Sequence, residues 1–173
     1  KHRACVEAWQ SGRARGEHGV DMPLKLEGTY NFSTPTDTLV LELKEASQEF
    51  VFTGITKKPV PSLLRNFSAP INLEFDYRDE ELAFLLAHDS DAFNRWEAGQ
   101  KLAMQMILEG RPPDAALIAA YRNLLTDPDL DPAFKELALT LPAEVYLYEQ
   151  CASVDPQKIY SSRRAFRHVI ASE

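Results

Sequence analysis

The histidines are the first residues of this 173-residue chain that could do chemistry, because imidazole binds zinc and moves protons near neutral pH. They stand at His2, His18, His88 and His168. No two have the spacing of H-E-x-x-H, which places two imidazoles on one helix face around zinc. His88 and His168 could meet in space, but both are expected near helix ends, where a cation opposes the helix dipole. The pattern predicts no metal site.

Paired carboxylates could supply general acid–base chemistry. They occur in three groups: Asp76, Asp79, Glu80 and Glu81; Asp89 and Asp91; and Asp127, Asp129 and Asp131. These groups fall at expected helix starts and turns, where capping of backbone N–H groups explains them. The third group alternates acids as part of a calcium loop does, but it lacks the central glycine and the bidentate glutamate of that loop. We interpret it as a turn.

Motifs for phosphate binding and for serine nucleophiles are missing: the sequence contains no G-x-x-x-x-G-K-[ST], G-x-G-x-x-G or G-x-S-x-G. Cys5 and Cys151 are the only cysteines, which is too few for a disulfide framework or a zinc knuckle. Cys151 has no basic neighbour in sequence that would activate its thiol as a nucleophile. The sequence therefore predicts no catalytic, cofactor-binding or metal-binding residue in this chain. The two thiols are expected to be reduced, as in a cytoplasmic protein.

The balance of charge excludes two classes of partner. The formal net charge is −7 and the isoelectric point is about 5.2. Binding to nucleic acid or to anionic lipid requires a basic surface, so neither is expected. No apolar run approaches the roughly 20 residues that span a bilayer, and no apolar stretch follows the basic start as in a signal peptide. We expect no nucleic acid and no membrane among the partners.

Two surface features have alternative interpretations. Phe93 and Trp96 are expected to be core anchors rather than a platform for a ligand. Arg163, Arg164 and Arg167 form a basic patch beside His168. The default interpretation of this patch is a solvated helix face. The more specific alternative is that the patch contacts an acidic surface of a partner.

The residue pattern of 1–77 is typical of short strands and turns. Residues 1–20 are predicted to be an irregular or divergent lead-in, with a short helix around Ala4–Gln10 as one alternative. Residues 21–77 alternate apolar and polar side chains, which predicts strands. The alternating positions are Leu24 and Leu26; Leu39, Leu41 and Leu43; Phe50 and Phe52; and Ile71, Leu73, Phe75 and Tyr77. Pro59 and Pro61 cannot donate to a ladder, so they mark an edge or a connection. We predict a small antiparallel Ig-like β-sandwich, complete or partial.

The residue pattern of 78–173 is typical of helices. Asp79 with Glu80 and Glu81 marks one start, and Ser90 or Asp91 caps the next helix. Gly110 ends that helix, and Asp131-Pro132 and Asp155-Pro156 each pair an N-cap with proline at the first helical position. Short connections favour antiparallel neighbours. The fold class is thus predicted as α+β in two segregated parts, the second being helical hairpins stacked in the manner of an α-solenoid.

Several ordered blocks resemble the bacterial aminopeptidase N family of zinc-dependent gluzincin aminopeptidases. Pro59–Ile71 is similar to the end of the family's β-sandwich domain, and Asp91–Gln100 is similar to the start of its C-terminal helical domain. Three further blocks occur in the expected order: Glu45–Phe52, Leu130–Ala133 and Leu139–Pro142. The resemblance runs from about Met22 to the end of the chain.

The resemblance implies a multi-domain exopeptidase that removes N-terminal residues from peptides. In that family zinc is held by H-E-x-x-H and a distant glutamate, and none of these elements is found here. This chain is therefore expected to be an inactive fragment with scaffold and active-site-covering roles, completed by an upstream catalytic domain. Zinc and the peptides would be bound in the parent enzyme. Residues 1 to about 18 depart from the family, which a divergent strand, a cloning artefact or a shifted reading frame would explain.

Two other hypotheses remain at this stage. The chain could be a helical-repeat module that binds a partner protein or peptide in a concave groove. It could also be a free-standing enzyme of another type, although no set of titratable groups indicates one. Incompleteness would further predict exposed apolar side chains at Tyr160, Phe166 and Ile170. Such a surface, or an open sheet edge, could support a homodimer.

Overall fold

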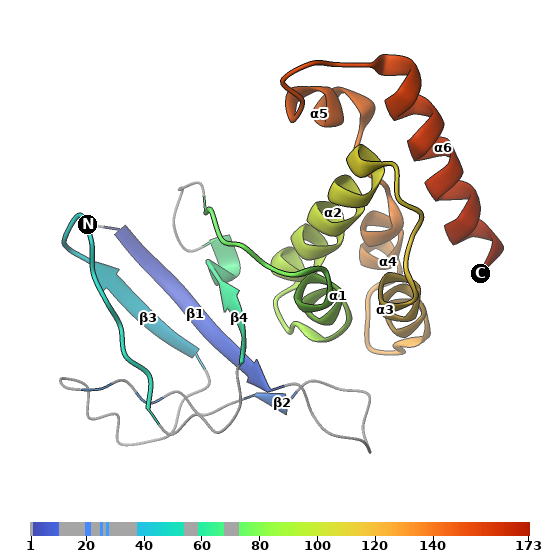
Figure 1. Cartoon of the computed structure of the whole chain (residues 1–173). Coiled ribbons are helices and arrows are strands. Elements are labelled where there is room, and N and C mark those ends of the chain that lie inside the picture. Colours follow the sequence, from blue (N-terminus) through green and yellow to red (C-terminus); the bar gives the residue numbers. More distant parts are fainter. Residues whose placement is uncertain are drawn as a thin grey trace. The chain divides into compact units, whose positions relative to one another are not determined.

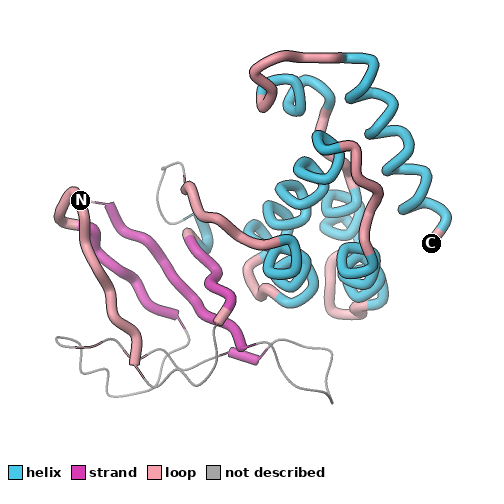
Figure 2. Tube along the Cα trace, viewed as in Figure 1, coloured by secondary structure: helices cyan, strands magenta, loops and turns pink. Residues whose placement is uncertain are grey.

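The computed structural model describes residues 2–10, 20–21, 25, 27, 38–53, 59–67 and 73–173. The chain divides into two compact units. The first comprises Lys1–Asp76 and His88–Asn94, and the second comprises Tyr77–Ala87 and Arg95–Glu173. The strands belong to the first unit, and nearly all helical residues belong to the second (Figures 1 and 2).

A four-stranded sheet forms the body of the first unit. Its strands are β1 (His2–Gln10), β2 (Val20–Asp21), β3 (Thr38–Leu43) and β4 (Val60–Leu63). β1 pairs antiparallel with each of the other three (Figure 1). Leu39 and Leu41 share the buried face of β3, and Phe50 and Phe52 pack against them. The strand predicted from the alternating leucines is thereby confirmed, since residues two apart lie on one face.

The residues around the sheet bear on three further predictions. Pro61 lies in β4, which pairs only with β1 among the described strands, so the predicted edge position is confirmed. Leu24 and Leu26 lie outside the described residues, but their neighbours Lys25 and Glu27 form backbone hydrogen bonds with Thr53 and Val51. A second sheet facing the first is not seen in the described part of the chain.

The start of the chain is a strand, which agrees with the divergent strand among the predicted alternatives and differs from an irregular lead-in. Residues His2–Gln10 form β1, the central strand of the sheet, and not a helix over Ala4–Gln10. The difference is physical, because the stability of a strand comes from its neighbours more than from its own sequence. Ladders to β3 and β4 supply hydrogen bonds that a single segment does not reveal.

The strand predicted over Ile71–Tyr77 is wrong for the residues that the structure describes. Leu73–Arg78 lie outside helices and strands, and Leu73 and Phe75 are each 39% exposed. An alternating pattern forms a strand only when a neighbouring strand completes its ladder. None of the described strands pairs with this segment.

Several helices begin or end at the residues that the local signals indicate. They are α1 (Asp79–His88), α2 (Ala92–Glu109), α3 (Ala115–Thr126), α4 (Pro132–Leu139), α5 (Glu144–Glu149) and α6 (Pro156–Ser172). Asp131 and Asp155 cap α4 and α6 through their side chains, as predicted, with proline at the first helical position. After α2, Gly110 adopts a φ of 72°, the left-handed conformation that ends a helix.

The second unit is built on apolar side chains that are almost fully buried, taken from α1, α2, α3, α5 and α6: Leu82, Leu86, Leu102, Met106, Ile107, Leu117, Leu124, Leu147 and Phe166. Gly99 of α2 lies against Leu86 of α1, where an added Cβ would come within 3.0 Å of a Leu86 methyl carbon. The glycine therefore permits the close approach of the two helices. α3 contacts α4, and α5 contacts α6.

Two predictions about apolar side chains are wrong. Phe93 is 38% exposed and is not a core anchor, whereas Trp96 is half-buried. Phe166 was expected to face solvent but is 1% exposed, and Ile159, seven positions earlier on the same helix face, is buried with it. Tyr160 is exposed, as predicted. None of the described helices is long and apolar enough to cross a bilayer.

Candidate functional site

A cluster of buried polar side chains lies within the first unit. It joins β4 and the turn that follows it to the connection between α1 and α2 and the first turn of α2. We call it the Arg65–Asp89 cluster; its members are Ser62, Arg65, Asp89, Ser90, Asp91 and Asn94. All of them except Ser90 are buried. Because polar groups in such an environment must be paired, their hydrogen bonds determine what the cluster can do.

Arg65 is the centre of the cluster. Its Nη1 donates to Asp89 Oδ1 over 2.7 Å and to Ser62 Oγ over 3.2 Å. Its Nη2 donates to Ser90 Oγ over 2.6 Å. Asn94 Nδ2 donates to Ser62 Oγ and to the carbonyl oxygen of Leu63, each over 2.8 Å. The guanidinium therefore has fixed partners and is not directed at a ligand.

The backbone beside Arg65 is bent to reach these partners. Leu64 and Asn66 have φ values of 56° and 53°, in the left-handed region. Asparagine tolerates this conformation, but leucine adopts it at a cost. Asp91 Oδ2 accepts the backbone N–H of Asn66 over 2.9 Å, and its Oδ1 accepts the N–H of Asn94 over 2.9 Å. One carboxylate thus both caps α2 and holds the bend.

Asp89 has the electrostatic environment of a structural carboxyl group. Burial raises its pKa above the ordinary value, and Ser62, the Asp91 N–H and Arg65 oppose that shift. Its Oδ2 has no hydrogen-bond partner within the described structure. The Asp89 side chain is 0% exposed, so it cannot exchange protons with a substrate in solvent.

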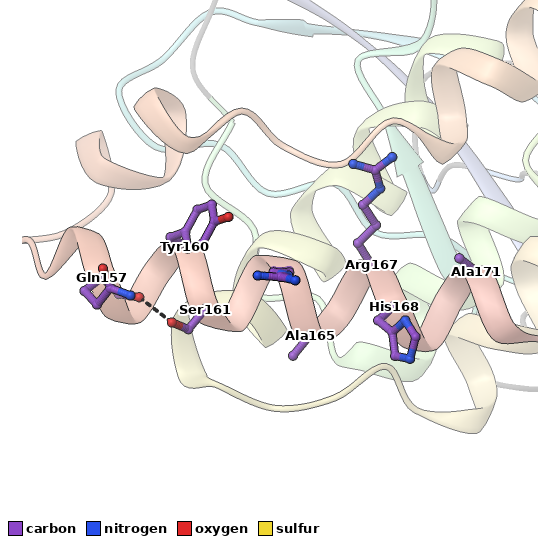
Figure 3. A pocket seen from close by; sticks show the side chains of 8 residues that line it. Gln157, Tyr160, Ser161, Ala165, Arg167, His168 and Ala171 are labelled. Carbon is purple, nitrogen blue, oxygen red and sulfur yellow. Dashed lines mark hydrogen bonds between the residues drawn. The ribbon is translucent and has the colours of Figure 1, made fainter.

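The exposed side of α6 is the second candidate region. A shallow depression runs along it, lined by residues of this helix alone: Gln157, Tyr160, Ser161, Arg164, Ala165, Arg167, His168 and Ala171 (Figure 3). We call these residues the α6 outer face. All of them are exposed, while Ile159 and Phe166 on the opposite side are buried. The outer face is a surface for contact rather than an enclosed pocket.

The basic patch predicted from sequence is smaller in the structure. Arg163 Nε donates to the carbonyl oxygen of Pro142 over 2.8 Å, so this arginine ties α6 to the segment before α5. Arg164, Arg167 and His168 remain on the α6 outer face.

A groove between α3, α6 and the end of α4 is the third region. It has a volume of about 310 Å³ and is mainly apolar, lined by Ile118, Tyr121, Leu125, Leu139, Leu141 and Ile170, with Arg122 and Arg167 among its polar residues. Burial raises the pKa of Tyr121 to about 12, so its phenol stays neutral at physiological pH. Arg122 is paired with Glu173. Glu173 is the acidic residue of the lining, and its carboxylate is held by this arginine.

The histidines and the cysteine whose side chains are described, His88, His168 and Cys151, do not gather into a site. His88 ends α1, and His168 is exposed on α6. His18 and the side chain of His2 lie outside the described residues. The Cys151 thiol is half-buried and lies 3.5 Å from the carbonyl oxygen of Leu147.

Several of the predicted acidic candidates act as caps and turn formers. In the run Asp127–Asp131, Asp127 Oδ1 accepts the N–H of Asp129, and Asp131 Oδ1 accepts the N–H of Ala133. The described residues contain no group of three His, Cys, Asp or Glu side chains that could hold a metal ion. With H-E-x-x-H missing from the sequence, these residues do not fit the zinc site of a gluzincin peptidase.

Sequence reasoning missed the Arg65–Asp89 cluster. Its members come from two segments more than twenty positions apart, and no periodic pattern connects them. The only local signal was the N-cap position of Asp91.

Comparisons with known proteins agree with the two-part organisation. Residues 79–173 match the family described as "Domain of unknown function (DUF3458_C) ARM repeats". Residues 12–76 match the family described as "Domain of unknown function (DUF3458) Ig-like fold". The first part is therefore Ig-like by family, and the second is a helical repeat.

The curated relatives are longer proteins. Aminopeptidase N of Escherichia coli is 36% identical over 143 residues, which cover 78% of this chain and 16% of that protein. Aminopeptidase N of Caulobacter vibrioides is 38% identical over 141 residues, with the same shares covered. This chain thus spans about a sixth of the length of the curated relatives that it matches.

A solved structure has the same fold. A crystal structure of Legionella pneumophila aminopeptidase A in complex with aspartic acid matches 99% of this chain with a TM-score of 0.71 and 23% identity. The match covers 18% of that chain. The chain described here belongs to the DUF3458_C family of ARM-repeat domains and is homologous over most of its length to a segment of bacterial aminopeptidases N.

Proposed function

We propose that this chain is a non-catalytic segment of an aminopeptidase that removes N-terminal residues from peptides. Homology to aminopeptidases N over 78% of the chain, combined with the lack of H-E-x-x-H in all 173 residues, supports the proposal. Zinc and the reacting peptide would be held by an upstream catalytic domain of the same enzyme. The residues described here would form scaffold beside that domain and cover its active site.

Several finer features belong to the same proposal. The Ig-like part would complete a small β-sandwich over residues 21–77, and the helical domain would begin at residue 78. We further propose a cytoplasmic location. The apolar groove between α3 and α6, or the edge of the sheet, would provide a surface for a homodimer.

The proposal predicts that the purified chain does not hydrolyse an alanyl chromogenic substrate, with or without added zinc. The reason is chemical: no described group of His, Cys, Asp or Glu side chains could hold a metal ion, and among the candidate carboxylates Asp131 caps a helix and Asp89 pairs with an arginine. An intact aminopeptidase N assayed in parallel controls for the substrate. Zinc-dependent turnover that persists through repeated purification of this chain would refute its non-catalytic role.

A further inference from the structure

The bend that follows β4 contains two residues in an unfavourable backbone conformation. Leu64 and Asn66 have φ values of 56° and 53°, in the left-handed region. Glycine adopts this region freely and asparagine tolerates it, but leucine populates it roughly tenfold less than the right-handed region, because its Cβ approaches the next carbonyl oxygen. Strained backbone of this kind persists only where the surrounding structure imposes it, and it is enriched at switch regions. We call residues 63–66 the β4 bend.

The bonds that hold the β4 bend lie on both sides of Leu64. Before it, the carbonyl oxygen of Leu63 accepts a hydrogen bond from Asn94 Nδ2 over 2.8 Å. After it, the N–H of Asn66 donates to Asp91 Oδ2 over 2.9 Å. Both partners lie in the segment His88–Asn94, which is part of the first compact unit although the match to the helical family includes it. The conformation of the bend is thus imposed by a segment that is distant in sequence, and its own residues do not favour it.

Asp91 divides two tasks between its two carboxylate oxygens. Oδ2 holds the N–H of Asn66, and Oδ1 accepts the N–H of Asn94 over 2.9 Å and so caps α2. A helix cap requires only one acceptor oxygen. The bond to the β4 bend can therefore break while α2 stays capped. Asp114 is a cap of the simpler kind: its Oδ1 accepts the N–H of Leu117 over 2.8 Å, and its other oxygen has no bond to the described part of the chain.

We propose that the β4 bend is a strained conformational latch, which the second carboxylate oxygen of Asp91 holds closed. When that bond breaks, Leu64 and Asn66 leave the left-handed region and the chain leaves β4 in a different direction, whereas α2 remains folded. Relief of the backbone strain favours opening, and the bond from Asn66 to Asp91 opposes it. This inference does not depend on the proposed aminopeptidase function.

The test separates the two oxygens of Asp91 in the full chain. Serine caps a helix about as well as aspartate, but its single oxygen on a shorter side chain cannot also reach Asn66. Asp91→Ser therefore removes the latch bond and keeps the cap. Asp114→Ser is the matched control, because it makes the same exchange at a cap without the second bond. NMR measures hydrogen exchange of the amides and the intraresidue NOE between the amide proton and Hα, which is strong when φ is positive.

Asp91→Ser is expected to lower the protection of the Asn66 amide by about tenfold, since a hydrogen bond to a charged group is lost. The protection of the Asn94 amide should change by less than about threefold, because serine keeps the cap. The strong intraresidue NOEs of Leu64 and Asn66 should weaken as the bend opens. Leu64→Asn in the same background should restore them, because asparagine tolerates the left-handed region. Asp114→Ser should change none of these signals.

Three outcomes would overturn the proposal. NOEs of Leu64 and Asn66 that stay strong in Asp91→Ser would show that the rest of the Arg65–Asp89 cluster fixes the bend without this carboxylate. Equal loss of protection at the Asn66 and Asn94 amides would show that the two bonds break together, so that no latch acts apart from the cap. A loss of helical circular dichroism beyond that of Asp114→Ser would mean that Asp91 supports the fold as a whole rather than a local latch.

Discussion

Arg65→Met is expected to lower the free energy of unfolding of the first unit by about 3–5 kcal/mol. Methionine keeps most of the arginine's length but removes the guanidinium. The Asp89 carboxylate, which is 0% exposed, would then lose the cation that lies 2.7 Å away. The left-handed bend at Leu64 and Asn66 would also lose a restraint. Urea denaturation measures the effect, and hydrogen exchange at the Asn66 and Asn94 amides localises it.

Arg111 provides a matched control, which shows whether burial causes the large loss of stability expected for Arg65→Met. Arg111 pairs with Asp79 over 2.9 Å, but its side chain is 41% exposed. Arg111→Met should therefore cost no more than about 1 kcal/mol, since exposed ion pairs contribute little. If Arg65→Met proves equally mild, the cluster does not stabilise the first unit as we infer.

Phe166→Ala is expected to lower the free energy of unfolding of the second unit by about 3–5 kcal/mol, the usual cost of truncating a buried phenylalanine. Phe166 is 1% exposed, on the side of α6 opposite its outer face. Removing the ring leaves a cavity that close-packed neighbours fill only in part. Chemical denaturation followed by far-ultraviolet circular dichroism measures the loss, because this unit holds nearly all of the helices.

Tyr160→Ala is the matched control on the same helix. Tyr160 is 47% exposed, so its truncation should change stability by only about 0.5 kcal/mol. Similar values for the two variants would mean that Phe166 faces solvent, as the sequence alone suggested.

The helices could be predicted from the sequence because their signals are local. Asp131-Pro132 and Asp155-Pro156 contain both the cap and the first helical residue, and the structure has α4 and α6 starting there. The strand predicted over Ile71–Tyr77 failed because a ladder needs a partner that the pattern does not contain. A strand at the position of β1 was only one of several predicted alternatives for the same reason, since its pairing with β3 and β4 is non-local.

Sites were harder to predict than elements. Arg65 and Asp89 are 24 positions apart, and only folding brings them together. Phe166 is buried through the packing of the helical unit, which its own helix pattern does not contain; α6 also contacts α5, a short helix for which the sequence analysis made no prediction. Arg163 looked equivalent to Arg164 in sequence, but the carbonyl oxygen of Pro142 gives it a structural role.

A segment exchange tests the central claim most directly. Residues 79–173 of this chain would replace the matching segment of Escherichia coli aminopeptidase N, and hydrolysis of an alanyl chromogenic substrate would be measured. If this chain is scaffold from such an enzyme, the chimera should be folded and retain activity within about tenfold, which corresponds to a change of about 1.4 kcal/mol in the barrier. A chimera that folds with its catalytic domain intact and yet has no activity would contradict the account.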